Sequence, residues 1–326
     1  MLKRVTADLI VPVVDLLLSP LIVVAAILMK VVRRLGIWRM PISKRIFNRV
    51  GIFPIRDHYY EPMFNHSAQL IHSLDDERQL PGIDMNEAAQ LELLARFDYA
   101  DELKRFPVMP SDASSFYYRN PNFVEGDAEC LYSLIRLSKP KRIVEIGSGF
   151  STMMARHAIA RNMAEDSSYL CRHVCIEPYE MGWLSAVPGI EVLRQRVEQM
   201  DRQIFRELEE GDILFIDSSH MIRPQGDVLC ECLEILPILQ AGVLIHFHDI
   251  FTPRDYLASW LLDEVKLWNE QYLLEAFMSC NSSFEVVAAL NFLKHHHPAR
   301  MAEKFPMLGE RMEQAEPGSF WIRKVI

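Results

Sequence analysis

The chain has 326 residues, half of them hydrophobic, which is enough for one large domain with an extension. Its formal net charge is −9, but residues 1–50 carry nine Lys or Arg against two Asp (+7), so the remaining residues carry −16. A globular part this acidic is a poor candidate for nucleic-acid binding, because phosphate contacts need clustered positive charge. The six cysteines form no Cys-x-x-Cys pair, which is typical of reduced core residues in a cytosolic domain.

The segment 9–29 is mostly apolar and has a single charge, Asp15, along its whole length. Its 21 residues are about the length that a helix needs to cross a bilayer core of ~30 Å. Asp15 and two prolines leave a second arrangement open, in which the helix is bent, re-entrant or lies on anionic lipid. In either arrangement, the basic residues that follow place the rest of the chain on the cytoplasmic side of the inner (plasma) membrane. We therefore expect residues 1–50 to be a membrane anchor.

Residues 51–114 follow no single pattern, and we expect them to form a lead-in region of helices and loops. Residues 87–106 have helical spacing, and residues 57–61 (Asp-His-Tyr-Tyr-Glu) form a polar-aromatic cluster. Aromatic side chains with polar tips suit sugars and other polar ring substrates, so this cluster is a candidate lining for an acceptor pocket. The alternative is a loop that packs its aromatic residues onto the core.

The most informative stretch is residues 142–151, Arg-Ile-Val-Glu-Ile-Gly-Ser-Gly-Phe-Ser. Its apolar residues predict a buried strand, Gly147 and Gly149 predict a tight turn, and Ser151 is placed where the N-cap of the next helix belongs. A strand, a glycine-rich turn and a helix N-terminus together predict a nucleotide site at the carboxyl edge of a parallel sheet. A dinucleotide fingerprint needs a third glycine where Thr152 stands, and no P-loop lysine follows.

The pattern Glu-x-Gly-x-Gly-x-Ser, from Glu145 to Ser151, resembles the first motif of class I S-adenosylmethionine (SAM)-dependent methyltransferases, in a bacterial, membrane-attached branch. This resemblance covers residues 115–326 and implies an α/β fold: a Rossmann-like sheet of seven mostly parallel strands with helices on both faces. The N-terminal membrane helix is added to that domain, and a long loop is expected to join the last two strands. After the strand at 142–146, the expected strands are 173–178, 190–197, 211–220, 242–250, 284–290 and 319–325.

The resemblance also implies which residues bind SAM. The carboxylate of Glu145 would order the loop and meet the amino-acid part of the cofactor. Glu177, at the end of the second strand, would accept hydrogen bonds from both ribose hydroxyls. The implied cofactor-binding residues are Glu145, Gly147, Ser148, Gly149, Ser151 and Glu177.

Two acid–histidine pairs end the fourth and fifth expected strands: Asp217 with His220, and His248 with Asp249. Neighbouring parallel strands present their carboxyl ends to one crevice, so we expect these catalytic candidates to converge. Methyl transfer to oxygen or nitrogen requires removal of the acceptor's proton, and either histidine could be the base. Alternatively, Asp217, His248 and Asp249 could hold a divalent metal ion, which is similar to the metal-dependent O-methyltransferases. Those enzymes have an acid at the position of His248, and histidine shifts the preference toward transition metals.

Together these patterns predict a SAM-dependent methyltransferase at the cytoplasmic membrane face. Its expected reaction is O-methylation of a small or lipid-linked, glycan-like acceptor. Two alternatives stay open: an NAD(P)- or nucleotide-sugar-dependent α/β enzyme, and a non-catalytic methyltransferase-like scaffold. The oligomeric state does not follow from the sequence.

Overall fold

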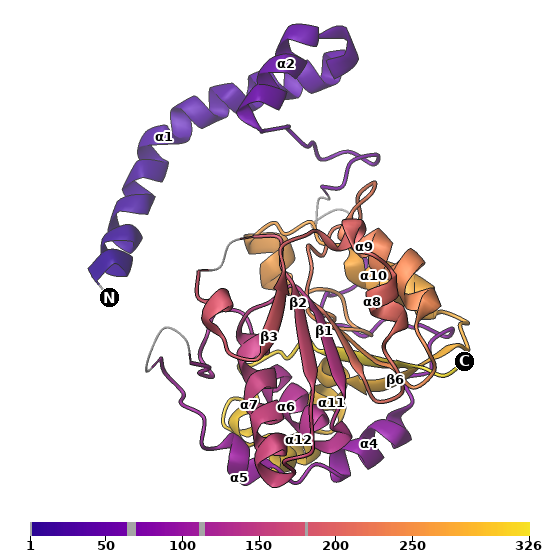
Figure 1. Cartoon of the computed structure of the whole chain (residues 1–326). Helices are drawn as coiled ribbons and strands as arrows, with labels where there is room; N and C mark the ends of the chain where they lie inside the picture. Colours follow the sequence, from indigo (N-terminus) through magenta and orange to yellow (C-terminus); the bar gives the residue numbers. More distant parts are fainter. Residues whose placement is uncertain (1, 64–69, 111–114, 180–181) are drawn as a thin grey trace. The chain divides into compact units, whose positions relative to one another are not determined.

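The computed structural model describes residues 2–63, 70–110, 115–179 and 182–326 (Figure 1). Residues 64–69 and 111–114 of the expected lead-in region lie outside the described residues. The chain divides into two compact units, Met1–Ile71 and His72–Ile326. The second unit therefore contains both the sheet and the described residues of the lead-in region from His72 onward.

The first unit is built on one long helix, α1 (Leu2–Leu35). Its part from Ile10 to Leu35 is long and apolar enough to cross a membrane, and the structure buries none of it. Gly36 follows α1 with a φ of 93°, a value that glycine adopts without strain. A 3₁₀ turn, η1 (Ile37–Arg39), then leads into α2 (Pro41–Val50).

The second unit is organised around one seven-stranded sheet with the order β3-β2-β1-β4-β5-β7-β6. The first five strands pair in parallel, and β7 is antiparallel to both β5 and β6. Strands β4 and β5 are buried at every position, which is typical of parallel strands covered on both faces. All seven expected strands are confirmed: β1 Arg142–Ile146, β2 Arg172–Ile176, β3 Ile190–Leu193, β4 Ile213–Ile216, β5 Leu244–Phe247, β6 Phe284–Ala289 and β7 Phe320–Lys324.

Helices flank the sheet on both sides, with α6 and α7 packed together on one side and α8, α9 and α10 on the other (Figure 1). Three short helices, α11 to α13, connect β6 to β7, so the expected long loop is wrong. The helices of this unit are α4 Glu87–Ala95, α5 Ala100–Leu103, α6 Asp127–Ser138, α7 Phe150–Glu165, α8 Gln203–Arg206, α9 Asp227–Cys230, α10 Glu270–Met278, α11 Leu290–His296, α12 Pro298–Lys304 and α13 Pro306–Gly309. Shorter 3₁₀ and π turns are η2 Leu184–Ala186, η3 Val197–Gln199, η4 Glu231–Ile235, η5 Leu236–Ile238 and η6 Ser259–Asp263.

The strand register brings several chain segments to one edge of the sheet. Ile146, the last residue of β1, is level with the last residues of β2 and β4, Ile176 and Ile216. Ile216 is in turn level with Phe247 at the end of β5, which pairs with Phe320 at the start of β7. The loops after β1, β2, β4 and β5 and the segment before β7 therefore meet at this carboxyl edge, where ligands of such sheets bind.

Candidate active site

The turn after β1 is held by a glycine that no other residue can replace. Gly147 has a φ of 79°, and a Cβ added to it would lie 1.9 Å from the carbonyl oxygen of Asp217. Its N–H donates to the carbonyl oxygen of Ile176, 3.1 Å away. At Gly149, by contrast, an added Cβ would meet no atom of the chain within 4 Å. Gly147 thus allows the loops after β1 and β4 to approach each other closely, whereas Gly149 has open space beside it.

Glu145 is buried beneath this turn and ties it to the start of α7. Its carboxylate accepts hydrogen bonds from Ser151 Oγ (2.8 Å) and Thr152 Oγ1 (2.7 Å), and it lies 3.0 Å from His173 Nε2. The helix begins at Phe150 with Gly149 at the N-cap, so the expected N-cap role of Ser151 is wrong. The hydroxyl of Ser151 instead binds Glu145 inside the core.

Glu177, directly after β2, links two loops through backbone donors. Its Oε2 accepts a hydrogen bond from the N–H of Ser148 (3.2 Å) and its Oε1 from the N–H of Tyr179 (2.9 Å). A carboxylate oxygen offers two acceptor positions, so each oxygen retains one for a ligand hydroxyl. The position of this carboxylate therefore suits a diol such as a ribose.

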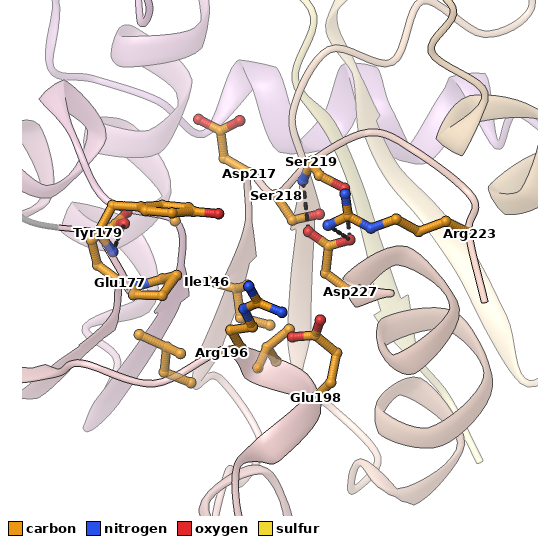
Figure 2. A pocket seen from close by; sticks show the side chains of 14 residues that line it. Ile146, Glu177, Tyr179, Arg196, Glu198, Asp217, Ser218, Ser219, Arg223 and Asp227 are labelled. Atoms are coloured by element: carbon orange, nitrogen blue, oxygen red, sulfur yellow. Dashed lines mark hydrogen bonds and ion pairs between the residues drawn. The ribbon is translucent and has the colours of Figure 1, made fainter. Parts of the chain in front are cut away.

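A cavity of about 180 Å³ lies over the ends of β1, β2, β3 and β4, and we call it the glycine-loop pocket. Figure 2 shows Glu177 and Tyr179 on one side of it and Ser219, Arg223 and Asp227 on the other. Asp227 accepts hydrogen bonds from the N–H and the hydroxyl of Ser219, at 3.0 and 2.6 Å. The lining residues are Ile146, Gly147, Ile176, Glu177, Pro178, Tyr179, Arg196, Val197, Glu198, Asp217, Ser218, Ser219, Arg223 and Asp227.

Three of the residues predicted from sequence line this pocket: Gly147, Glu177 and Asp217. The residues after β3 were missed because the third strand was expected to reach position 197. The strand ends at Leu193, and the turn η3 (Val197–Gln199) brings Val197 and the neighbouring Glu198 to the pocket. The rule that applied to β1, β2, β4 and β5 would have identified them, since β3 ends at the same edge.

The acid–histidine cluster, Asp217, His220, His248 and Asp249, comes together as expected at the ends of β4 and β5. His220 Nε2 lies 3.3 Å from Asp217 Oδ1 and 3.6 Å from Asp249 Oδ2. His248 Nε2 lies 3.4 Å from Asp249 Oδ1. His220 and Asp249 both have a positive φ, 57° and 58°, which is uncommon for residues other than glycine and concentrates at functional sites.

A buried carboxylate that the sequence did not indicate completes this cluster. Glu270, in the first turn of α10, places its Oε2 2.7 Å from His220 Nδ1. A carboxylate can only accept, so Nδ1 carries the proton and Nε2 faces the two aspartates. Glu270 is 50 positions from His220 in the chain, and no local pattern marks this contact.

In this cluster the histidines and the carboxylates stabilise each other's charged forms. Burial alone would lower the pKa of His220, but its hydrogen bonds to Asp217 and Glu270 keep that pKa well above the usual range. Burial would likewise lower the pKa of His248, yet Asp249 and Asp217 raise it to about 9. Desolvation favours the neutral form of Asp217, but His248 and His220 bring its pKa down to about 2. Cationic charge, from protons or a metal ion, is therefore required beside the two aspartates.

Within the cluster, the donor set that fits a divalent cation is Asp217, His220 and Asp249, whose ligand atoms lie within 4.8 Å of one another. His248, also predicted as a ligand, lies outside this set: its Nε2 is 3.2 Å from the carbonyl oxygen of Asn122, a contact that requires a proton on Nε2. Two carboxylates and one imidazole suit Mn²⁺, Fe²⁺ or Zn²⁺. Glu270 behind His220 supplies the outer carboxylate that metal-binding histidines commonly have.

A second cavity, of about 390 Å³, is lined mainly by residues that follow β5 and precede β7, and we call it the β5–β7 pocket. Phe251 lines it two residues after Asp249, a Cα separation of no more than ~7 Å. Glu316 lines it two residues before Gly318, which packs against the backbone of Asp249. Most of its lining side chains are polar or charged: the full set is Leu74, Asp75, Phe251, Arg254, Asp255, Leu257, Ala258, Ser259, Asn291, Gln314 and Glu316.

A family model described as a methyltransferase domain matches residues 144–250, which span the glycine turn and the acid–histidine cluster. An uncharacterized protein from Archaeoglobus fulgidus is 30% identical over 173 residues, which cover 50% of this chain and 76% of that protein.

Two solved structures of O-methyltransferases are also similar to this chain. TomG from Streptomyces achromogenes, in complex with SAM, has 13% identity and a TM-score of 0.35 over 72% of this chain and 90% of its own. The Bacillus cereus enzyme has 15% identity and a TM-score of 0.35 over 80% of this chain and 95% of its own. With TM-scores this low, the two structures add no evidence about the fold beyond the observed sheet order. The family model over the glycine turn and the acid–histidine cluster, together with the seven-stranded sheet, identifies a class I SAM-dependent methyltransferase domain in this chain.

Proposed function

We propose that this methyltransferase transfers a methyl group from SAM to a hydroxyl of a polar, glycan-like acceptor at the cytoplasmic face of a membrane. The observation that carries the proposal is the order of sites along the carboxyl edge. The glycine-loop pocket lies over the ends of β1 to β4, the acid–histidine cluster follows β4 and β5, and the lining of the polar β5–β7 pocket begins again at Phe251, two residues after Asp249. Asp217 belongs both to the lining of the glycine-loop pocket and to the cluster, so a cofactor in that pocket would lie next to the cluster.

The proposed cofactor site uses the residues expected from the sequence in two ways. Gly147, Ser148, Gly149 and Glu177 form the surface that SAM would contact, with Glu177 on the ribose. Glu145 and Ser151 lie beneath this surface, and the hydrogen bond between them fixes the start of α7. Bound SAM would supply a methyl group on a positively charged sulfur.

On the acceptor side, the cluster has to take up the proton of the hydroxyl that attacks the methyl carbon. In its neutral form His220 would accept that proton at Nε2, because Glu270 binds the other ring proton at Nδ1 and stabilises the cation that forms. The neighbouring carboxylates hold the pKa of His220 well above the usual range, so this route operates at high pH. A divalent cation held by Asp217, His220 and Asp249 would instead lower the pKa of the acceptor hydroxyl. Both routes place the acceptor oxygen beside Asp217, which also lines the glycine-loop pocket.

The glycan-like nature of the acceptor is supported by the polar groups of the β5–β7 pocket. Arg254, Asp255, Asn291, Gln314 and Glu316 offer both donors and acceptors, as a polyhydroxylated ligand requires. The polar-aromatic cluster at 57–61 belongs to the first unit, where Tyr59 and Tyr60 are exposed. The membrane location is supported by α1 and by the basic residues that follow its apolar part.

The test uses the full chain in detergent micelles. Calorimetric titration should show binding of SAM and none of NAD⁺ or a nucleotide-sugar. Incubation with methyl-deuterated SAM and membrane lipid extracts should then place label on an oxygen of a lipid-linked or free saccharide, read by mass spectrometry. Label that appears only on nitrogen or on protein would contradict the proposed acceptor.

A chelator separates the two ways of removing the proton. Loss of turnover on chelation, restored by Mn²⁺ or Mg²⁺, supports a metal ion at Asp217, His220 and Asp249. Undiminished turnover in chelator, together with an inactive His220→Ala variant, supports a histidine base.

A further inference from the structure

The helix α2 (Pro41–Val50) presents two faces of opposite character to solvent. Ile42, Ile46 and Val50 are spaced four residues apart and form one apolar stripe, with 72%, 54% and 63% of each residue exposed. By the same periodicity Lys44 and Arg45 lie away from this stripe and Arg49 borders it beside Ile42; these three exposed residues are called the basic face of α2. No residue of α2 is buried.

The charges around α2 have one sign. From Leu16 to Arg56 the chain contains eight Lys or Arg and no Asp or Glu. Within the described residues, Glu61 forms ion pairs with Arg33 and Arg56, and the three basic residues of α2 have no carboxylate partner. The basic face of α2 is thus available to an anionic surface.

The position of α2 in the chain adds an independent argument. Gly36 separates it from α1, so α2 is a distinct helix that begins at Pro41 directly after the turn η1. Trp38, in that turn, is 76% exposed. An indole has an apolar body and a polar N–H, and tryptophan is enriched where hydrocarbon meets headgroups.

We propose that α2 and Trp38 form an interfacial element that lies in the headgroup layer of an anionic phospholipid bilayer. The stripe Ile42, Ile46 and Val50 enters the acyl boundary, and Lys44, Arg45 and Arg49 contact lipid phosphates. This element acts in addition to α1 and does not depend on the proposed methyl transfer. Its preference is for anionic lipid, whereas an apolar span such as α1 needs no particular headgroup.

The experiment follows Trp38 in the full chain reconstituted into vesicles. Bromine atoms on the upper acyl chain quench tryptophan emission only at short range, and a Trp38→Phe variant gives the contribution of the other four tryptophans for subtraction. We expect strong quenching and a blue shift of the Trp38 emission in vesicles with ~30% anionic lipid, which imitate a negatively charged leaflet. In purely zwitterionic vesicles we expect weaker quenching.

Two variants test the two faces. Lys44→Glu, Arg45→Glu and Arg49→Glu together should abolish the difference between anionic and zwitterionic vesicles, since each basic residue contributes about five-fold to partitioning. Ile42→Ser, Ile46→Ser and Val50→Ser should reduce quenching in both. As the matched control, Lys104→Glu, Arg105→Glu and Arg300→Glu change three exposed charges in the second unit and should leave Trp38 as in the natural chain.

The proposal is overturned if Trp38 is equally quenched in both kinds of vesicle, or if the three glutamates have no effect. It is also overturned if Trp38 responds to added RNA or an acidic polypeptide and not to anionic lipid, because α2 would then serve a macromolecular partner. SAM binding by the detergent-solubilised variants separates the two proposals. Loss of lipid preference with SAM binding intact concerns α2 alone, and failure of the natural chain to bind SAM concerns the enzyme alone.

Discussion

The carboxylates at the two ends of the active-site edge have different partners. Near β1 and β2, Glu145 and Glu177 accept hydrogen bonds mainly from hydroxyls and backbone N–H groups, so the surrounding chain largely satisfies them. Near β4 and β5, Asp217 and Asp249 instead face two histidines, and neutrality there depends on a proton or a cation. The first end can hold a ligand without changing its own charge, and the second can exchange a proton. Binding and chemistry are thereby separated along one sheet edge.

The largest effect that tests this separation is expected at Asp249. The change Asp249→Asn keeps the shape and removes the charge, so methyl transfer should fall by ~10²- to 10⁴-fold. Asp249 does not line the glycine-loop pocket, and SAM affinity should stay within about two-fold. Radiolabelled methyl transfer and calorimetry measure the two quantities, with the exposed Asp263→Asn as the control. Normal turnover in Asp249→Asn would make this residue purely structural.

The next effect is on stability and compares the two glycines of the turn. Gly147→Ala should lower the free energy of unfolding by about 3 kcal/mol, because it adds a strained positive φ to a clash with the backbone at Asp217. Gly149→Ala should cost about 1 kcal/mol or less, since its φ of −178° is extended and its Cβ meets nothing. Thermal unfolding followed by circular dichroism measures both. Equal losses of stability in the two variants would show that the backbone at Asp217 moves aside at little cost.

At the binding end, the change Glu177→Ala should weaken SAM about 30-fold, which corresponds to ~2 kcal/mol for charge-assisted hydrogen bonds to the ribose. Glu313→Ala changes an exposed glutamate outside the glycine-loop pocket, and as the matched control it should bind SAM normally. Calorimetric titration gives the affinities. An affinity within two-fold of the natural chain would remove Glu177 from the ribose site.

The smallest expected effect is at Glu270, beside the acid–histidine cluster at the ends of β4 and β5. Glu270→Gln removes the charge behind His220, so turnover should fall about ten-fold while SAM affinity stays unchanged. If a metal ion is present, the affinity of the chain for Mn²⁺ should fall by about the same factor. A variant with normal turnover and normal metal affinity would leave Glu270 as a buried hydrogen-bond partner of His220 only.

The sheet could be predicted from the sequence because apolar runs ending in glycine, acid or proline are local signals. The same signals located Gly147, Glu177 and Asp217 at one edge. The first turn of α7 was misassigned because Ser151 is a good N-cap by type, whereas its hydroxyl is taken by Glu145 in the core.

The pairing in the acid–histidine cluster could not be predicted in the same way. His220 and His248 follow neighbouring strands, and residue spacing cannot tell which ring faces both aspartates. That choice depends on Glu270, which reaches His220 from α10, and on Asn122, whose carbonyl oxygen binds His248. Both are tertiary contacts between distant segments. The helices α11 to α13 were missed because each is too short to show a helical period.

The left-handed backbone at His220 and Asp249 has a consequence for engineering this protein. A non-glycine residue in that conformation costs about 1 kcal/mol or more, and glycine would relieve the cost. A library screened only for heat resistance should therefore enrich Asp249→Gly, which would lose its reactivity. His220→Gly should be depleted, because it would leave Glu270 and Asp217 without their buried partner. Selection for durability and selection for turnover would favour different residues at position 249 and the same residue at position 220.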